Sequence, residues 1–178
     1  FLGPLLGSVF RPFGGWLSDR IGGARVTFWT FLAMAVGTVV CVVASLMASL
    51  PLFVIGFIGL FLFSGIGNGS TYKMIPAIFH TRAKAAIDAG EPERTAMAQA
   101  RRNSGALIGI AAAVGALGGL FINLAFRQSF SATASGVLAF VGFLAFYAIC
   151  FVVTYVVYLR RVGASARQGR LALAGADG

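Results

Sequence analysis

Long apolar segments, separated by short polar or basic groups, make up most of this chain. A helix needs about 20 predominantly apolar residues to cross the hydrocarbon layer of a bilayer. The pattern therefore predicts an all-α membrane protein with five transmembrane helices, at residues 1–18, 26–48, 52–79, 105–124 and 136–159. Residues 80–104 are predicted to form a large loop, and residues 160–178 a tail.

The composition supports this interpretation. Of the 178 residues, 58% are hydrophobic and only 11% are charged, and the mean hydropathy is +0.89. Soluble domains carry about 25% charged residues, so the chain is an integral membrane protein with the lipid bilayer as a partner. A net charge of +9 would suggest a nucleic-acid partner in a soluble protein. No nucleic acid is expected here, because membrane topology accounts for the basic residues.

Basic residues fall in alternate connections between the predicted helices. They occupy the first connection, the 80–104 loop and the tail: Arg20, Arg25, Arg82, Lys84, Arg94, Arg101, Arg102, Arg160, Arg161, Arg167 and Arg170. The second connection has none, and the fourth has only Arg127. Cytoplasmic loops carry the excess of Lys and Arg, so we expect a multi-pass plasma (inner) membrane protein with its N-terminus outside, or periplasmic, and its C-terminus cytoplasmic. Because Phe1 lies in apolar sequence with no Met or basic leader before it, we expect a truncated chain.

Two cations, Arg11 and Lys73, are the only charged residues inside the predicted apolar segments. Each costs about 2.5–3.5 kcal/mol at the centre of a membrane helix, and their common sign points to an anionic ligand. Small residues share their helix faces and allow a close approach by another helix or a cavity. These are Gly3, Gly7, Ser8, Gly14, Gly15 and Ser18 around Arg11, and Gly65, Gly69, Ser70, Pro76 and Ala77 around Lys73.

Each cation also has a structural explanation. Lys73 lies roughly 10 Å from the end of its predicted helix, within reach of headgroups or water for a long side chain. Arg11 lies roughly 12 Å from Asp19 along its helix, and it could pair with a carboxylate on a helix outside this chain.

The fourth predicted helix is rich in glycine. Gly105, Gly109, Gly115, Gly118 and Gly119 leave about half of its surface almost without side chains. Such a face is typical of a tight helix crossing, because small residues let backbones approach closely. The alternative is a smooth wall that presents backbone dipoles to a small substrate.

The sequence lacks the clusters of His, Cys and acidic residues that form metal sites and the active sites of soluble enzymes. There is one histidine, no Cys or His cluster, and no acidic residue inside a predicted span. The five acidic residues fall in loops or the tail: Asp19, Asp88, Glu91, Glu93 and Asp177. We expect no catalytic residue, no metal and no cofactor, and therefore no enzyme. The lack of an intramembrane carboxylate also argues against a proton-driven cation or drug exporter.

The first connection resembles a loop of a known transporter superfamily. The segment Gly15-Trp-Leu-Ser-Asp19-Arg20-Ile-Gly22-Gly23-Ala-Arg25 is similar to the Gly-x-Leu-x-Asp-Arg-x-Gly loop of the major facilitator superfamily. The resemblance implies a cytoplasmic gating motif made of Gly15, Asp19, Arg20, Gly22 and Arg25. Its physical basis is a tight glycine turn with an aspartate near helix ends.

Two further segments narrow the resemblance to the nitrate/nitrite porter (NarK-type) family. They are Gly65-Ile-Gly-Asn68-Gly-Ser-Thr-Tyr-Lys73-Met-Ile-Pro76-Ala-Ile-Phe79 and Gly109-Ile-Ala-Ala-Ala-Val-Gly115-Ala-Leu-Gly118-Gly119-Leu-Phe121. The resemblance covers nearly the whole chain, as helices eight to twelve of a twelve-helix transporter. It implies that Arg11 pairs with nitrate and that residues 109–121 form a nitrate signature. The implied substrate-binding residues are Arg11, Asn68, Lys73, Gly109, Ala112, Gly115, Gly118 and Gly119.

The resemblance implies a transporter of nitrate and nitrite that serves nitrate assimilation and works by alternating access around a mid-membrane anion site. Nitrate/nitrite exchange and proton-coupled nitrate uptake both remain open, so protons are a possible partner, and Lys73 is a candidate for separating the two subtypes. The N-terminal half of the transporter would supply the rest of the site. Two alternatives remain: a major facilitator porter for another organic anion or a drug, and a non-transporting membrane scaffold that binds partner helices through its glycine faces.

Overall fold

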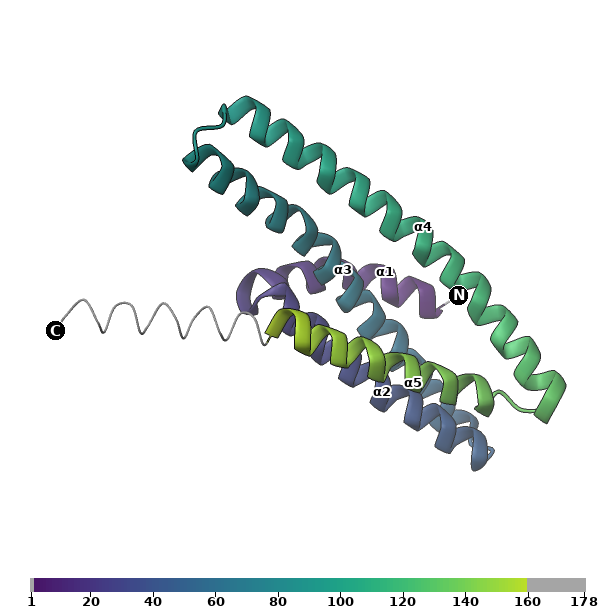
Figure 1. Cartoon of the computed structure of the whole chain (residues 1–178). Helices are drawn as coiled ribbons and strands as arrows, with labels where there is room; N and C mark the ends of the chain where they lie inside the picture. The colour runs from purple at the N-terminus through teal and green to yellow at the C-terminus, as the bar shows by residue number, and fades with distance from the viewer. Residues whose placement is uncertain (1, 160–178) are drawn as a thin grey trace.

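The computed structural model describes residues 2–159, which form five α-helices and a closing π-helical turn (Figure 1). The elements are α1 (Leu2–Ile21), α2 (Gly23–Leu46), α3 (Leu50–Asp88), α4 (Glu93–Thr133), α5 (Val137–Thr154) and η1 (Tyr155–Leu159). Four segments are long and apolar enough to cross a membrane: α2, α3, α4 and the stretch from α5 to Val157. The described residues contain no strand, and the predicted all-α membrane fold is confirmed, although α1, one of the five predicted spans, is not among these four segments.

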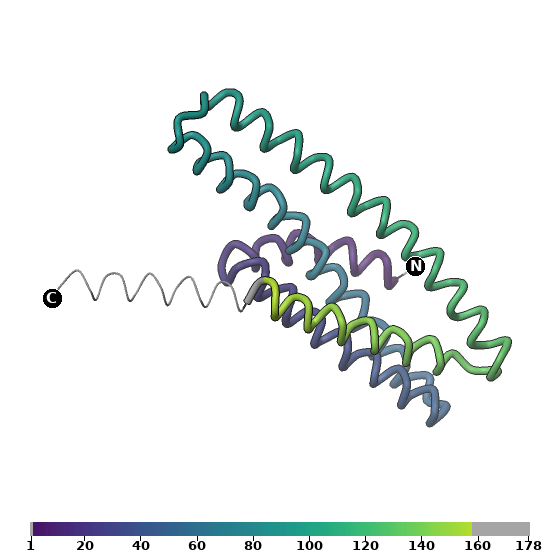
Figure 2. The backbone as a smooth tube through the Cα atoms, in the orientation of Figure 1, coloured from purple at the N-terminus to yellow at the C-terminus, as the bar shows by residue number. Residues whose placement is uncertain are grey.

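Helix α3 is the centre of the arrangement (Figure 2). It packs against α1, α2 and α4, while α5 lies against α2. Aromatic contacts join the last pair: the ring of Phe28 lies 4.3 Å from that of Phe151, and the ring of Phe31 lies 6.5 Å from that of Tyr147. Three of the described helices therefore meet at α3, and any site between them depends on its side chains.

The segment at 80–104 differs from the loop predicted for it. Helix α3 continues to Asp88 and α4 begins at Glu93, so most of the segment is a helical hairpin closed by a short turn. Ala, Arg, Lys, Gln and Glu dominate the segment and are strong helix formers. Gly90, at φ +100°, makes the left-handed turn that ends α3. Figure 1 shows this hairpin extending well beyond the turn between α1 and α2; we call this the hairpin end of the bundle.

The remaining helices differ from their predicted bounds by a few residues. The segment predicted at 1–18 reaches Ile21, and the one predicted at 26–48 runs from Gly23 to Leu46. The segment predicted at 136–159 divides into α5 and η1. The predicted tail, residues 160–178, lies outside the described residues.

The contact between α1 and α3 is made by backbone against backbone. A Cβ added to Gly14 would lie closer than 3 Å to the backbone of Ile66. A Cβ on Gly65 would meet the backbone of Gly7 in the same way, and one on Gly69 would meet the backbone of Arg11. Real Cβ atoms essentially never approach so closely. The small face around Arg11 therefore meets a partner helix, one of the two options that the sequence left open, and we call this contact the α1–α3 seam.

We predict that Gly69→Ala lowers the thermal stability of the intact protein, because its new methyl group must push α1 away from α3. The expected cost is about 1–3 kcal/mol, the usual range for overpacking. Gly59→Ala is the matched control, since a Cβ at that position of α3 meets nothing within 4 Å. Thermal unfolding of the purified proteins in one detergent measures both. Equal melting temperatures for the two variants would show that the seam is not close-packed.

Candidate functional site

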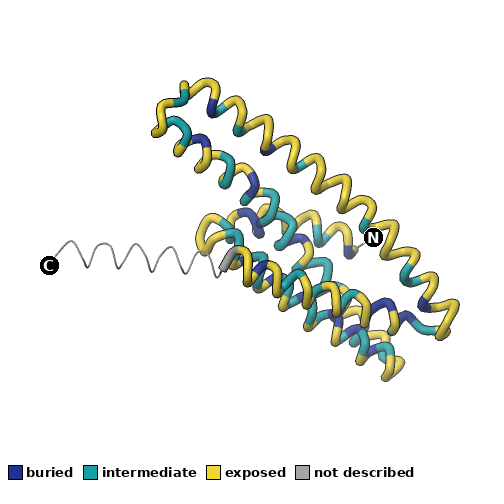
Figure 3. The backbone as a smooth tube through the Cα atoms, in the orientation of Figure 1, coloured by how far each residue is buried: buried dark blue, intermediate teal, exposed yellow. Residues whose placement is uncertain are grey.

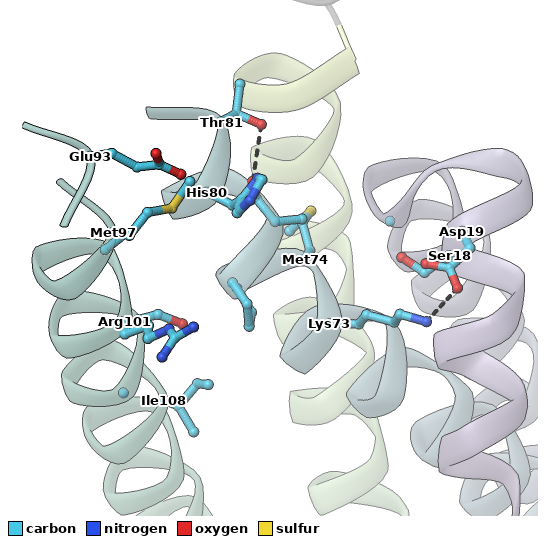
Figure 4. A pocket seen from close by; sticks show the side chains of 16 residues that line it. Ser18, Asp19, Lys73, Met74, His80, Thr81, Glu93, Met97, Arg101 and Ile108 are labelled. Carbon is cyan, nitrogen blue, oxygen red and sulfur yellow. Dashed lines mark hydrogen bonds and ion pairs between the residues drawn. The ribbon is translucent and has the colours of Figure 1, made fainter. Parts of the chain in front are cut away.

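A cavity of about 1080 Å³ lies between α1, α3 and α4 at the hairpin end (Figure 4). Its wall on α1 includes Ser18 and Asp19, and its wall on α3 includes Lys73 and His80. Helix α4 contributes a longer stretch, from Glu93 through Arg101 and Ser104 to Gly105 and Ile108. Two of the residues predicted for separate functions, Asp19 of the gating motif and Lys73 of the substrate site, therefore share one cavity.

Asp19 and Lys73 form an ion pair across the α1–α3 seam, between Nζ of the lysine and Oδ2 of the aspartate. The seam makes this possible: Gly15 leaves room for the lysine stem, whose Cδ lies 3.4 Å from the place of a Cβ on that glycine. The side chains of Lys73 and Asp19 are 49% and 57% exposed, so the pair faces the cavity. Solvent screening then limits its contribution to stability to about 1 kcal/mol or less.

The turn that follows Asp19 is as tight as the glycine motif predicts. Only Gly22, at φ +90°, separates α1 from α2, and this left-handed conformation suits glycine. The guanidinium of Arg20 lies 4.2 Å from the centre of the Trp16 ring, a cation–π contact. Arg25 is exposed on the first turn of α2.

The role of Ser70 cannot be recognised from the sequence. This serine is fully buried, and its hydroxyl donates a hydrogen bond of 3.1 Å to the backbone carbonyl of Gly23. The bond fastens α3 to the beginning of α2, directly after the gating motif. From the sequence, Ser70 is only a small neighbour of Lys73, because nothing in the sequence indicates which carbonyl lies opposite its hydroxyl.

Arg11 has a different environment from Lys73. Its backbone lies in the α1–α3 seam against Gly69, but its side chain is exposed. Among the described residues, no hydrogen bond or ion pair of the Arg11 guanidinium is found, and it does not line the cavity. Arg11 and Lys73 have similar surroundings in the sequence, but they differ in the structure. Lys73 forms an ion pair, whereas the side chain of Arg11 is exposed.

Asn68 lies apart from both cations. It lines a smaller pocket between α2 and α3, together with Thr27, Ser64 and Thr71. On a helix, neighbouring positions point about 100° apart, so Asn68 turns towards α2 while Gly69 turns towards α1. The structure therefore does not bring Asn68 together with Arg11 or Lys73.

The glycine series of α4 makes no close contact with the described helices. A Cβ at Gly105, Gly109, Gly115, Gly118 or Gly119 meets nothing within 4 Å. Ala112 is exposed as well, and no residue of the most apolar window of α4 is buried (Figure 3). Within residues 2–159, α1 and α4 do not pack against each other. The glycine series is therefore not used for a helix crossing inside the described part of the chain.

Apolar helices around a charged cavity define a multi-pass helical membrane protein. No protein-family model matches the chain. It is 40% identical to the nitrate/nitrite transporter NarU of Salmonella typhimurium and 39% identical to NarU of Escherichia coli, in each case over 90% of this chain and 36% of the relative. It is 34% identical to the probable nitrate/nitrite antiporter NarK2 of Thermus thermophilus, over 90% of this chain and 32% of that protein.

These similarities confirm the resemblance found in the motifs. The chain is a homologue of the nitrate/nitrite porters of NarK type. It spans about a third of the length of the curated relatives that it matches.

We predict a measurable coupling between Asp19 and Lys73. In a double-mutant cycle of Asp19→Asn and Lys73→Gln, the two changes together should cost less than the sum of the single changes, by about 0.2–1 kcal/mol, as for other exposed pairs. Thermal unfolding in low salt measures the cycle. Lys84→Gln, an exposed position further along α3, replaces Lys73→Gln in the control cycle. Full additivity in the first cycle would show that the pair does not form in the membrane protein.

Proposed function

We propose that the chain is the C-terminal portion, helices eight to twelve, of a nitrate/nitrite transporter of the major facilitator superfamily, and that Arg11 binds the anion. The relatives named as nitrate/nitrite transporters support the substrate class. The observation that carries the assignment of the residue is the exposed Arg11 side chain, anchored by a close-packed backbone and with no carboxylate bound to it among the described residues.

The chemistry of Arg11 suits a small planar oxyanion. A guanidinium presents parallel N–H donors in one plane, so it can donate two hydrogen bonds to two oxygens of nitrate or nitrite at once. The neighbouring glycines hold the backbone of Arg11 against α3, which fixes the base of the side chain while its head is exposed.

We assign Lys73 to the gate in the conformation described here, in place of the direct substrate contact expected from the sequence. Its ammonium is bound to Asp19, the acidic residue of the gating motif. An ion pair between α1 and α3 at the hairpin end favours the arrangement in which these ends stay together. Opening that end would break the pair at small cost, since both side chains are already half exposed.

The glycine series of α4 is the second part of the proposed mechanism. Its smooth, open face, from Gly109 to Gly119, is available to the substrate and to helices outside this chain. In alternating access, two halves of a transporter rock about an anion held near the middle of the membrane, and a face without side chains permits this sliding. The other half would come from the two-thirds of the relatives' length that this chain does not span.

Two coupling modes fit these residues: exchange of nitrate for nitrite, and uptake of nitrate with protons. In either mode, the positive-inside rule places the hairpin end, with Arg82, Lys84, Arg94, Arg101 and Arg102, in the cytoplasm. The proposed location is the plasma (inner) membrane, with the N-terminus of this chain outside.

We predict that Arg11→Lys in the full-length transporter weakens nitrate binding although it keeps the charge. Loss of one charge-assisted hydrogen bond costs about 1.5–3 kcal/mol, roughly a tenfold to hundredfold increase in Kd. Nitrate binding to the purified protein, followed by tryptophan fluorescence or calorimetry, measures this. Arg127→Lys, at the opposite end of the bundle, is the matched control and should bind as the wild type does. Normal nitrate affinity in the Arg11→Lys variant would show that Arg11 is not part of the binding site.

We predict that Gly119→Leu reduces nitrate transport by the full-length protein to a small fraction of the wild-type rate, while membrane insertion is unchanged. The leucine side chain projects from the open face of α4 and obstructs the substrate or the opposing helix. Gly142→Leu on α5 is the control, because a Cβ there also meets nothing within 4 Å. Uptake of labelled nitrate into proteoliposomes compares the two. Equal uptake rates for the two variants would show that transport does not require an open face at Gly119.

A further inference from the structure

A second cation besides Lys73 lines the cavity between α1, α3 and α4. Arg101 contributes to it from α4, and its guanidinium points away from that helix into the space towards α3 (Figure 4). Lys73 is bound to Asp19 at the α1 wall, whereas no ion pair of Arg101 is found among residues 2–159. The described structure therefore leaves the charge of Arg101 inside the cavity without a carboxylate in contact with it.

Two further titratable residues line the cavity, His80 on α3 and Glu93 on α4. Glu93 begins α4 at the turn of the hairpin and precedes Arg101 by eight residues, roughly 12 Å along the helix. At that separation water and salt screen most of their interaction, since the Debye length is about 8 Å at physiological ionic strength. Of the charged residues that line the cavity from α4, Arg101 is therefore the one nearest to the apolar span.

The cavity continues along the glycine series of α4. Gly105, one turn after Arg101, lines the cavity, and so does Ile108. Gly119 follows Arg101 by 18 residues, about five full turns, so both positions lie on one face of the helix. The face of α4 that we propose as available to the substrate thus leads to Arg101 at the hairpin end.

We infer that this cavity is the cytoplasmic vestibule of the transporter and that Arg101 is a second anion-binding residue in it, which attracts nitrate or nitrite at the hairpin end of the path. The inference rests on the proposed function, because that proposal supplies both the substrate and the cytoplasmic location of the hairpin end. An uncompensated charge in a cleft concentrates counter-ions and raises their association rate, by about tenfold at the low end of the observed range. The cavity, at about 1080 Å³, is much larger than a nitrate ion, so Arg101 would act through its charge and not through the fitted hydrogen bonds proposed for Arg11.

Counterflow of labelled nitrate into inside-out vesicles, which present the cytoplasmic face of the full-length protein to the medium, tests this inference. We expect Arg101→Gln to raise the KM for nitrate at least about threefold, with little change in the rate at saturating nitrate. Arg102→Gln is the matched control: this exposed residue is the next one along α4 and does not line the cavity, so its variant should behave as the wild type does. Arg101→Lys keeps the charge and should retain most of the wild-type KM, in contrast to Arg11→Lys.

A second pair of variants tests the charge of the cavity while Arg101 stays in place. Gly105→Glu introduces a carboxylate one turn from Arg101, at a position where a Cβ meets nothing within 4 Å. It should raise the KM at least about threefold relative to Gly105→Gln, which has a side chain of the same size without the charge.

The inference is overturned if Arg101→Gln and Arg102→Gln have equal KM values, or if Gly105→Glu and Gly105→Gln do. It is overturned as well if Arg101→Lys is as impaired as Arg101→Gln, because the residue would then have a structural role. A wild-type protein that does not exchange nitrate would instead contradict the proposed function itself, so the two failures are distinguishable.

Discussion

The close approach of α1 and α3 is the constraint on which the rest of the site depends. Their backbones meet at Gly14, Gly65 and Gly69, where a single methyl group would not fit. This contact fixes where Arg11 leaves the helix, and it brings Asp19 within reach of Lys73 although they are 54 residues apart in sequence. In a membrane, van der Waals contact and hydrogen bonds hold helices together without a hydrophobic driving force, so small residues are the natural means of building such a seam.

The seam also explains why two cations of similar predicted depth have different surroundings. Lys73 follows Gly69 by one turn, on the side where α1 ends with a carboxylate, so it finds a partner within the chain. Arg11 lies further from that end, where neither helix offers an acidic side chain, and its guanidinium stays exposed. Lys73 thus forms an ion pair between α1 and α3, whereas the role that we propose for Arg11 is to bind the anion.

Much of this arrangement could be predicted from the sequence, and the parts that could not have identifiable causes. The apolar segments predicted the helices, Gly22 predicted the tight turn, and the small face around Arg11 indicated a contact with another helix or a cavity. The helical hairpin at 80–104 was missed because charge marks where a membrane span ends, whereas Ala, Arg, Lys and Glu let the helix continue into water. The Asp19–Lys73 pair and the direction of Asn68 depend on how α3 is rotated against its neighbours, which the spacing of residues in one helix does not determine.

The unbroken course of α3 from the membrane region into the hairpin makes it a lever arm. From Lys73 to Asp88 the helix is roughly 23 Å long at 1.5 Å per residue. A tilt of about 10° at the α1–α3 contact would then displace the tip by roughly 4 Å, provided that α3 moves as one rod through Pro76, the proline inside it. A small change inside the bilayer is thereby converted into a displacement at the tip large enough to be followed there with a spectroscopic label.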